Sequence, residues 1–476
     1  MAKQQNFVEQ IADIETNFPQ WYTDVVIKTG LVDYGPVKGT MVIKPYGYAI
    51  WENIQAELDK RFKATGHQNA YFPLLIPMSY FTKEAEHVEG FSPELAVVTH
   101  AGGEELAEPL VIRPTSETII GTMYSKWLQS YRDLPILMNQ WCNVMRWEKT
   151  TRPFLRTSEF LWQEGHTAHA TEEEAEAETM RMLAIYKEVA EDCLAMPVIT
   201  GRKTDKEKFA GAEATYGMEA MMKDGKSLQA GTSHYLGQNF AKAFDIKYLD
   251  ADGVQKYAYT TSWGVSTRLI GGIIMTHGDE RGLVLPPVVA PIQVVIVPIA
   301  ARKPGVMDVC KDIEAKLAAK GIRVKLDDTD NSTGWKFNEW EMKGVPLRIE
   351  LGPRDIEEGK ALFFRRDKLT KEPVALEDIE DEVQAALSAI QKDMLESARE
   401  RREARTTWAD NMEDLSKDLD AGNFVKAGWC GCRKCEDAVK EKLAATIRII
   451  LDSETADKCI VCGEKAEKAV IIARAY

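Results

Sequence analysis

The sequence predicts an α+β chain with a large antiparallel-sheet domain, a smaller α/β domain and a small cysteine-rich C-terminal domain. Its 476 residues suggest roughly three domains at about 150 residues each. Strand-like segments separated by turns fill much of the first part, strands alternate with helices after residue 286, and most cysteines crowd near the end. Each pattern is typical of a different architecture, so we expect the three domains in this order.

The composition is typical of an ordinary globular protein, with 45% hydrophobic and 28% charged residues. With 60 Lys+Arg against 74 Asp+Glu, the formal net charge of -14 argues against a protein that coats nucleic acid by bulk attraction. The N-terminus lacks the apolar core of a signal peptide, and the most apolar stretch, 288–301, is short and contains Pro291 and Pro298. We therefore expect a cytoplasmic protein without a membrane span, whose nucleic-acid contacts are local.

The first domain is expected to begin with a long helix that leads into a strand. Apolar residues recur at helical spacing over 44–65, and the pattern becomes strand-like at 69–76, around Pro73. Thr171 and Glu174 form a capping box that opens a helix reaching about residue 193. Further strands are predicted at 110–113, 143–148, 227–231 and 255–260. Because turns separate these strands, neighbours are expected to pair antiparallel.

Strands and helices alternate in the second domain. A helix is predicted over 306–319, and strands are predicted at 293–299, 322–326 and 347–351. This alternation is typical of a small α/β domain. Apolar residues from Val383 to Met394 then share one helical face. That helix is expected to connect the second domain to the cysteine-rich tail.

Arg146 and Glu148 are the first candidates for chemistry. The segment 143–160 is interpreted as strand, turn and strand, and alternation places both residues on one face. An Arg can hold a phosphate or carboxylate through two hydrogen bonds, and a nearby Glu can accept one from an exocyclic amine such as that of adenine. The alternative is an ordinary Arg–Glu pair on a sheet surface.

Ser266 and Arg268 are a second pair of candidates, because they precede an apolar helix whose start can receive a polyphosphate. The helix–strand–proline element, the Arg-x-Glu hairpin and this strand–helix Arg follow the order of motifs 1, 2 and 3 of class II aminoacyl-tRNA synthetases, which the chain resembles. In these terms motif 1 covers about 48–77, motif 2 about 141–164 and motif 3 about 260–287.

Three segments narrow the resemblance to prolyl-tRNA synthetases of the archaeal/eukaryotic-like type. They are Arg113-Pro-Thr115-Ser-Glu117, the run from Phe154 to His166, and Gln229-Ala-Gly-Thr232-Ser-His234. The resemblance implies a class II catalytic domain over 1–285, an α/β anticodon-binding domain over 286–382, a helical connector over 383–408 and a zinc-binding domain over 409–476. It also implies the substrates tRNA(Pro), L-proline and ATP with Mg²⁺, and a homodimer with motif 1 at its interface. The inserted editing domain of bacterial-type enzymes has no counterpart between motifs 2 and 3.

The resemblance assigns roles to individual residues. Those implied to bind ATP are Arg146, Glu148, Arg156, Thr157, Phe160, Gln229, Thr232, Ser266 and Arg268. Those implied to bind proline are Thr115, Glu117, Arg146, Trp162, Glu164, His166 and His234. Arg146 and Arg268 are the catalytic candidates, because carboxylate attack on the α-phosphate needs fixed cations rather than a nucleophilic side chain. Glu117 with Thr115 offers acceptors to the two N–H groups of a prolyl ammonium.

These assignments have structural alternatives. Trp162 can be a core aromatic residue, and His166 and His234 can be structural histidines with satisfied hydrogen bonds. Thr115 to Glu117 can form the N-cap of the apolar helix that follows, a role compatible with substrate binding.

Two other functions compete with proline activation. One is a sibling synthetase for threonine or glycine, against which the Thr115/Glu117 pair and Trp162 argue. The other is a catalytically silent paralogue that binds tRNA, against which the intact Arg146 and Arg268 argue. A pyrophosphate-exchange panel over amino acids distinguishes all three.

The C-terminal cysteines are spaced for a structural zinc site. Spacing alone favours Cys432 with Cys435, facing Cys459 and Cys462. The resemblance instead pairs Cys430 with Cys435 and leaves Cys432 spare, and we follow it. Four thiolate ligands leave no open position for catalysis. Two reduced, unrelated cysteine pairs are the alternative.

The resemblance also places anticodon recognition in the middle domain. Glu339, Arg348 and Glu350 are candidate readers of base edges there. Basic and acidic residues nearly balance over 334–368, so charge alone does not predict RNA binding. Tyr476, at the end of the sequence, resembles the family's terminal tyrosine, which approaches the active site.

Overall fold

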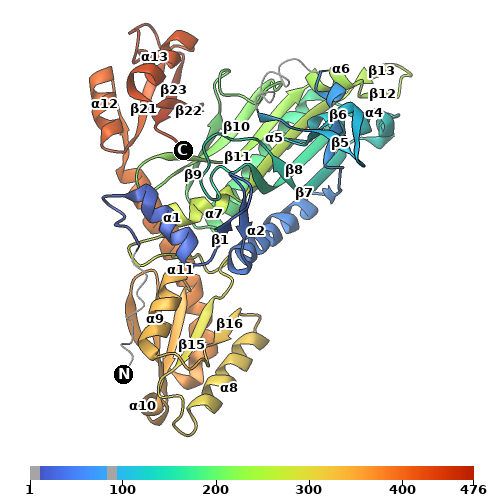
Figure 1. Cartoon of the computed structure of the whole chain (residues 1–476). Helices are drawn as coiled ribbons and strands as arrows, with labels where there is room; N and C mark the ends of the chain where they lie inside the picture. The colour runs from blue at the N-terminus through green and yellow to red at the C-terminus, as the bar shows by residue number, and fades with distance from the viewer. Residues whose placement is uncertain (1–10, 83–93) are drawn as a thin grey trace.

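The computed structural model describes residues 11–82 and 94–476. Figure 1 shows a large sheet region, a middle region below it and a C-terminal region at the upper left, with one long helix, α11 (Ile379–Ala404), running between the last two. Among the described residues, no helix is long and apolar enough to cross a membrane.

The large sheet has eleven strands in the order β20-β21-β23-β22-β9-β10-β11-β14-β8-β7-β3. From β9 to β7 every neighbouring pair is antiparallel, which confirms the expected mode of pairing. The strands of the first region are β9 (Val198–Arg202), β10 (Ala214–Met221), β11 (Ser227–Gly237), β14 (Tyr259–Ser266), β8 (Glu159–His169), β7 (Ile136–Met145) and β3 (Gln68–Asn69).

Helices cover one face of this sheet. They are α1 (Phe18–Lys28), α2 (Pro45–Ala64), α5 (Glu172–Glu188) and α7 (Arg268–His277). Their apolar residues share a core with Leu228, Trp263 and Val265 of the strands. Thr171 and Glu174 cap α5 reciprocally, as predicted. Because side chains alternate along a strand, the opposite face is left for the polar residues that form the site.

Smaller elements surround this face. They are β1 (Val32–Tyr34), β2 (Met41–Ile43), β4 (Leu75–Pro77), β5 (Ala96–Ala101), β6 (Glu104–Ile112), α4 (Glu117–Trp127), α6 (Asn239–Phe244), β12 (Lys247–Leu249) and β13 (Gln255–Tyr257). Three strand predictions were wrong in part. The segment predicted as one strand at 255–260 falls on β13 and the start of β14, which belong to different sheets. The segment predicted as one strand at 69–76 contains only the short β3 and β4, and the strand predicted at 143–148 ends at Met145.

The middle region is a five-stranded sheet with helices, as the alternation predicts. Its strands, in spatial order, are β16 (Val324–Leu326), β15 (Val294–Pro298), β17 (Leu347–Leu351), β18 (Lys360–Arg365) and β19 (Thr370–Ala375). Its helices are α8 (Val306–Ala319), α9 (Thr333–Met342) and α10 (Pro353–Glu357). The first three strands pair in parallel.

The C-terminal region continues the large sheet, which the sequence did not predict. Its elements are β20 (Thr406–Trp408), α12 (Met412–Asp420), β21 (Phe424–Trp429), α13 (Arg433–Leu443), β22 (Thr446–Leu451) and β23 (Lys468–Ala473). A bridge between Ile450 and Arg202 joins β22 to β9. A Cβ atom at Gly201 would lie 2.6 Å from the carbonyl oxygen of Ile450, so glycine is what permits this close approach.

Candidate active site

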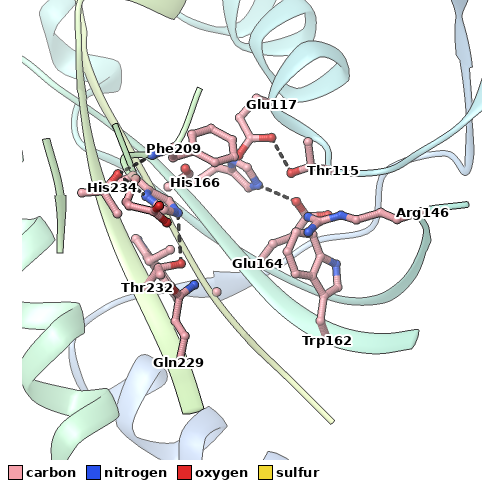
Figure 2. Close-up of a pocket in the computed structure, with 15 residues that line it drawn as sticks. Thr115, Glu117, Arg146, Trp162, Glu164, His166, Phe209, Gln229, Thr232 and His234 are labelled. Atoms are coloured by element: carbon pink, nitrogen blue, oxygen red, sulfur yellow. Dashed lines mark hydrogen bonds and ion pairs between the residues drawn. The ribbon is translucent and has the colours of Figure 1, made fainter. Parts of the chain in front are cut away.

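The predicted proline-binding residues meet in one cavity on the open face of the sheet (Figure 2). The cavity measures about 250 Å³. Strand β8 supplies Trp162, Glu164 and His166, which alternate along the strand and therefore share a face. The other predicted residues that line it are Thr115, Glu117, Arg146, Gln229, Thr232 and His234.

Glu117 is the first residue of α4, and its side chain is buried. Ser116 occupies the N-cap position, so the predicted helix start is confirmed. The hydroxyl of Thr115 donates a hydrogen bond to Glu117. Helix start and cavity wall therefore coincide, and the helix holds a carboxylate at the site that would accept hydrogen bonds from an ammonium group.

Glu164 lies at the centre of a buried polar network. It accepts hydrogen bonds from Ser116, Gln140 and His166. Burial alone would raise the pKa of the Glu164 carboxyl, but these hydrogen bonds hold it below its ordinary value. Burial also opposes protonation of His166, yet the hydrogen bond to Glu164, 2.8 Å long, raises the His166 pKa. Both partners are thus favoured in their charged forms.

His234 is a neutral imidazole in the same wall. Burial, followed by the charges of His166 and Arg146, lowers its pKa to about 3. Its two ring nitrogens lie 3.0 and 3.1 Å from the hydroxyls of Thr215 and Thr232. Phe209 stacks on the imidazole with ring centroids 4.5 Å apart.

Arg146 follows the end of β7. Its Nε donates to the carbonyl of Pro114 at 3.0 Å, and its guanidinium lies 5.5 Å from the Phe160 ring centroid and 5.4 Å from that of Trp162. Burial lowers the pKa of Arg146, and the carboxylates of Glu94 and Glu117 oppose that shift. Glu94 lines a second cavity and Glu117 the first, so Arg146 lies under the influence of both.

The second cavity measures about 540 Å³ and contains three predicted ATP-binding residues, Glu148, Arg156 and Arg268. Arg156 is 3.3 Å from Glu148. Arg268 donates to the carbonyls of Leu155 at 3.0 Å and Gln229 at 3.4 Å. Burial and the neighbouring arginines lower its pKa to about 10, which leaves it charged at neutral pH.

The remaining predicted ATP-binding residues lie around these cavities. Thr157 lines a third cavity of about 340 Å³, and Gln229 and Thr232 line the smaller first cavity rather than the second. The Oγ of Ser266 accepts a hydrogen bond from the backbone N–H of Arg268 at 3.1 Å. Arg146 and Glu148 follow β7 instead of lying within it, so the alternation argument for their shared face was wrong.

Sequence reasoning missed several residues that line the two cavities. Phe209 and Thr215 line the first, and Arg152 lines the second. They come from a loop, a strand and a turn that carry no recognisable local motif. Tyr476, by contrast, was expected near the active site from the resemblance; it lines the second cavity, with the Arg152 guanidinium 5.8 Å from its ring centroid.

Four cysteines form a cluster in the C-terminal region. The sulfur atoms of Cys430, Cys435, Cys459 and Cys462 all lie within 4.8 Å of one another. Cys432 is exposed and lies outside this group. The preference for Cys432 from spacing alone was therefore wrong. Four thiols at this separation fit a tetrahedral zinc ion, which takes Cys₄ ligand sets in structural sites.

The predicted anticodon residues lie together in the middle region. Arg348 and Glu350 are buried and form an ion pair of 2.9 Å, while Glu339 is partly exposed on α9. The Arg348 guanidinium lies between two rings, 3.9 Å from the Phe337 centroid and 4.1 Å from that of Phe364. Arg348 and Glu350 are thus structural partners, whereas Glu339 is partly exposed and forms an ion pair of 2.7 Å with Lys343.

Comparison with known proteins matches all three regions. Residues 99–277 match the tRNA synthetase class II core domain (G, H, P, S and T), residues 293–386 the anticodon binding domain, and residues 412–476 the C-terminal domain of prolyl-tRNA synthetase.

Full-length relatives have names consistent with these three matches. The proline--tRNA ligase of Alkaliphilus oremlandii is 62% identical over 478 residues, covering 100% of this chain and 99% of the relative. Proline--tRNA ligase 2 of Clostridioides difficile is 60% identical and both chains are covered completely. The crystal structure of prolyl-tRNA synthetase from Cryptosporidium parvum, complexed with halofuginone and AMPPNP, has a TM-score of 0.94 and 41% identity, covering 98% of this chain and 99% of that one. This chain therefore belongs to the proline--tRNA ligase family of class II aminoacyl-tRNA synthetases.

Proposed function

We propose that this chain activates L-proline with ATP to form prolyl-adenylate and then transfers the prolyl group to the 3'-terminal adenosine of tRNA(Pro), releasing AMP and diphosphate. The observation that carries this proposal is the position of Arg146, which lines the smaller cavity and is followed directly in the chain by Trp147 and Glu148, which line the larger one. An amino acid in the smaller cavity and a nucleotide in the larger one would meet near its guanidinium.

The smaller cavity suits a secondary ammonium attached to an aliphatic ring. Glu117, supported by Thr115, supplies a carboxylate acceptor, and Trp162, His166 and Phe209 supply flat walls. Glu164 holds His166 in its charged form and orients the ring. His234 remains neutral, so it can hydrogen bond without adding a second positive charge.

The larger cavity suits the ATP–Mg²⁺ substrate. Arg156, Arg268 and Glu148 line it; in the proposed complex the two arginines would bind phosphate oxygens and Glu148 would accept a hydrogen bond from the adenine amine. In the first step a carboxylate oxygen of proline attacks the α-phosphorus, and the bond to the β-phosphate oxygen breaks as diphosphate leaves. Arg146 and Arg268 stabilise the charge that develops on the phosphate oxygens. The relative from Cryptosporidium parvum, which binds AMPPNP, supports this assignment.

The pyrophosphate-exchange panel tests the function. The purified chain is incubated with ATP, labelled diphosphate and each amino acid in turn. Proline is expected to support the fastest exchange. Faster exchange with threonine or glycine would identify a sibling activity, and no exchange with any amino acid would identify a silent paralogue.

Three further properties follow from this function. The four-cysteine cluster holds a structural zinc ion that stabilises the C-terminal region and takes no part in the reaction. The middle region binds the anticodon of tRNA(Pro), with Glu339 contacting a base edge. We also place the protein in the cytoplasm.

The active form is a homodimer through the motif 1 region. Tyr71, Leu75 and Trp127 are exposed large apolar residues on or beside this segment. A second copy would bury them, which favours association. Sedimentation of the wild-type chain and of Tyr71→Glu tests this: we expect a dimer and a weakened dimer, respectively.

A further inference from the structure

A buried ion cluster links the C-terminal region to the strands of the site. Glu219 of β10 accepts hydrogen bonds from Lys203, Ser227 and Arg448. Arg448, on β22, contacts both carboxylate oxygens, each at 3.2 Å. All four side chains are at least nine-tenths buried. Arg448 is thus the contribution of the C-terminal region to a cluster otherwise made of residues 203–227.

The buried cluster around Glu219 is better explained by a role in positioning its neighbours than by a contribution to the free energy of unfolding. Removing three charged groups from water is costly, and a buried ion pair usually stabilises a fold no better than apolar residues of similar size. The same junction also has a more exposed ion pair, Lys206 with Asp437, which costs less to desolvate. The buried cluster therefore calls for a second role.

Glu219 lies opposite a residue of the site. In the pairing of β10 with β11, Glu219 faces Gln229, at the point where the register shifts. Such bulges re-aim the side chains beside them. The side chain of Gln229 lines the first cavity, and its carbonyl accepts a hydrogen bond from Arg268 at 3.4 Å. A displacement of Glu219 would therefore shift the backbone of Gln229, whose carbonyl accepts the hydrogen bond from Arg268.

Ser227 connects the ion cluster to Tyr476, a residue that lines the second cavity. Its backbone N–H donates to the carbonyl of Arg474 at 2.7 Å, and its carbonyl accepts from the N–H of Tyr476 at 3.1 Å. The Tyr476 hydroxyl donates to Asp224 at 2.6 Å, and its side chain lines the cavity. The start of β11 is therefore fastened both to the ion cluster and to a residue of the ATP pocket.

Glu219 also acts on Arg268 electrostatically. Burial, Arg156 and Arg146 lower the pKa of Arg268, and Glu219 and Glu148 oppose that shift.

We propose that Arg448 and Glu219 are positioning residues for ATP, through which the C-terminal region fixes the start of β11 and with it Gln229, Arg268 and Tyr476. This inference rests on the proposed function, because it concerns the ATP pocket of the activation step. It assigns the C-terminal region a role in nucleotide binding that is separate from its cysteine cluster.

The test compares Arg448→Met, the conservative Arg448→Lys and the control Lys206→Met, which breaks the more exposed ion pair across the same junction. Wild type must first show proline-dependent exchange, and its absence would refute the proposed function rather than this inference. KM for ATP and for proline are then measured separately, with zinc content and melting temperature recorded for each variant.

We expect Arg448→Met to raise KM for ATP about tenfold or more, because small displacements of a site can cost up to about a hundredfold. KM for proline should change much less than KM for ATP, because Arg268 and Tyr476 line the larger cavity and only Gln229 lines the smaller one. Zinc content should remain unchanged, Arg448→Lys should recover much of the loss, and Lys206→Met should match wild type. An unchanged KM for ATP, or equal losses for both substrates, would overturn the inference. If Arg448→Met does not fold, Ser227→Ala, which retains every charge, carries the test with the same criteria.

Discussion

Replacing Arg146 with alanine should nearly abolish adenylate formation while leaving the chain folded. Arg146 lines the smaller cavity and directly precedes Trp147 and Glu148 of the larger one, and its loss removes stabilisation of the charge that develops on the phosphate. Removing one such preorganised donor typically lowers the rate by about 10²- to 10³-fold, equivalent to about 3–4 kcal/mol of transition-state stabilisation.

The cost to folding should be smaller. The contacts of Arg146 include a hydrogen bond to the Pro114 carbonyl and ring contacts with Phe160 and Trp162. A hydrogen bond contributes about 1 kcal/mol and each cation–π contact about 0.5–1 kcal/mol. The free energy of unfolding should therefore fall by about 2–3 kcal/mol, within the range of about 5–15 kcal/mol that domains possess.

The assay is proline-dependent pyrophosphate exchange at saturating ATP and proline, with thermal unfolding measured on the same samples. Arg132→Ala is the matched control, because Arg132 stacks on Tyr131, 4.9 Å from its ring centroid, and lines neither cavity. The control should exchange at the wild-type rate. Exchange by Arg146→Ala within about twofold of wild type would refute the argument that Arg146 stabilises charge on the phosphate. Unfolding of Arg146→Ala at the assay temperature would refute the argument that the chain stays folded without this side chain.

Four other predictions follow from the site and its surroundings. Cys459→Ser should release one zinc per chain and lower the melting temperature, whereas Cys432→Ser should retain the metal; elemental analysis that finds no zinc in wild type would contradict this. Glu339→Ala should weaken aminoacylation through KM for tRNA(Pro) and leave proline exchange unchanged, and equal losses in both assays would contradict a role confined to RNA. Alanine lacks two ring carbons worth about 0.8 kcal/mol each, so we expect measurable alanine exchange and only spontaneous decay of preformed Ala-tRNA(Pro); faster deacylation would reveal an editing site. Because the pKa of His166 is raised and that of Glu164 lowered, this pair should stabilise the fold most between their ordinary values of 6.5 and 4.5, and less as pH rises or falls beyond them; a melting-temperature difference between wild type and His166→Gln that is constant with pH would contradict this.

The fold was predictable where the pattern was local. The cap formed by Thr171 and Glu174 sets the start of α5, and the alternation after residue 286 identifies the middle region. The prediction failed beyond Met145, where the chain leaves the sheet. There the N–H of Arg146 bonds to Ser158 at 2.8 Å, and Phe154 adopts a left-handed φ of 59°. Strand propensity contains no signal for such a loop.

Only the site residues that lie within recognisable sequence motifs were predictable. Thr115, Trp162 and His234 lie in recognisable segments, and the structure brings them to one cavity. Phe209 and Arg448 act through tertiary contact with distant strands, so their neighbours along the chain indicate nothing. The junction of β22 with β9 was missed for the same reason, since a single bridge joins segments far apart in sequence.

The covering of β9 by β22 has a consequence for how the chain is made. An uncovered strand edge presents unpaired backbone groups and is a template for pairing with other chains. Ile450 is synthesised about 250 residues after Arg202, which takes tens of seconds at about 5–20 residues per second. During that interval the edge at β9 is open on every nascent chain. We therefore expect pairing between nascent chains to be favoured while this edge is open, and to be suppressed once β22 has been made.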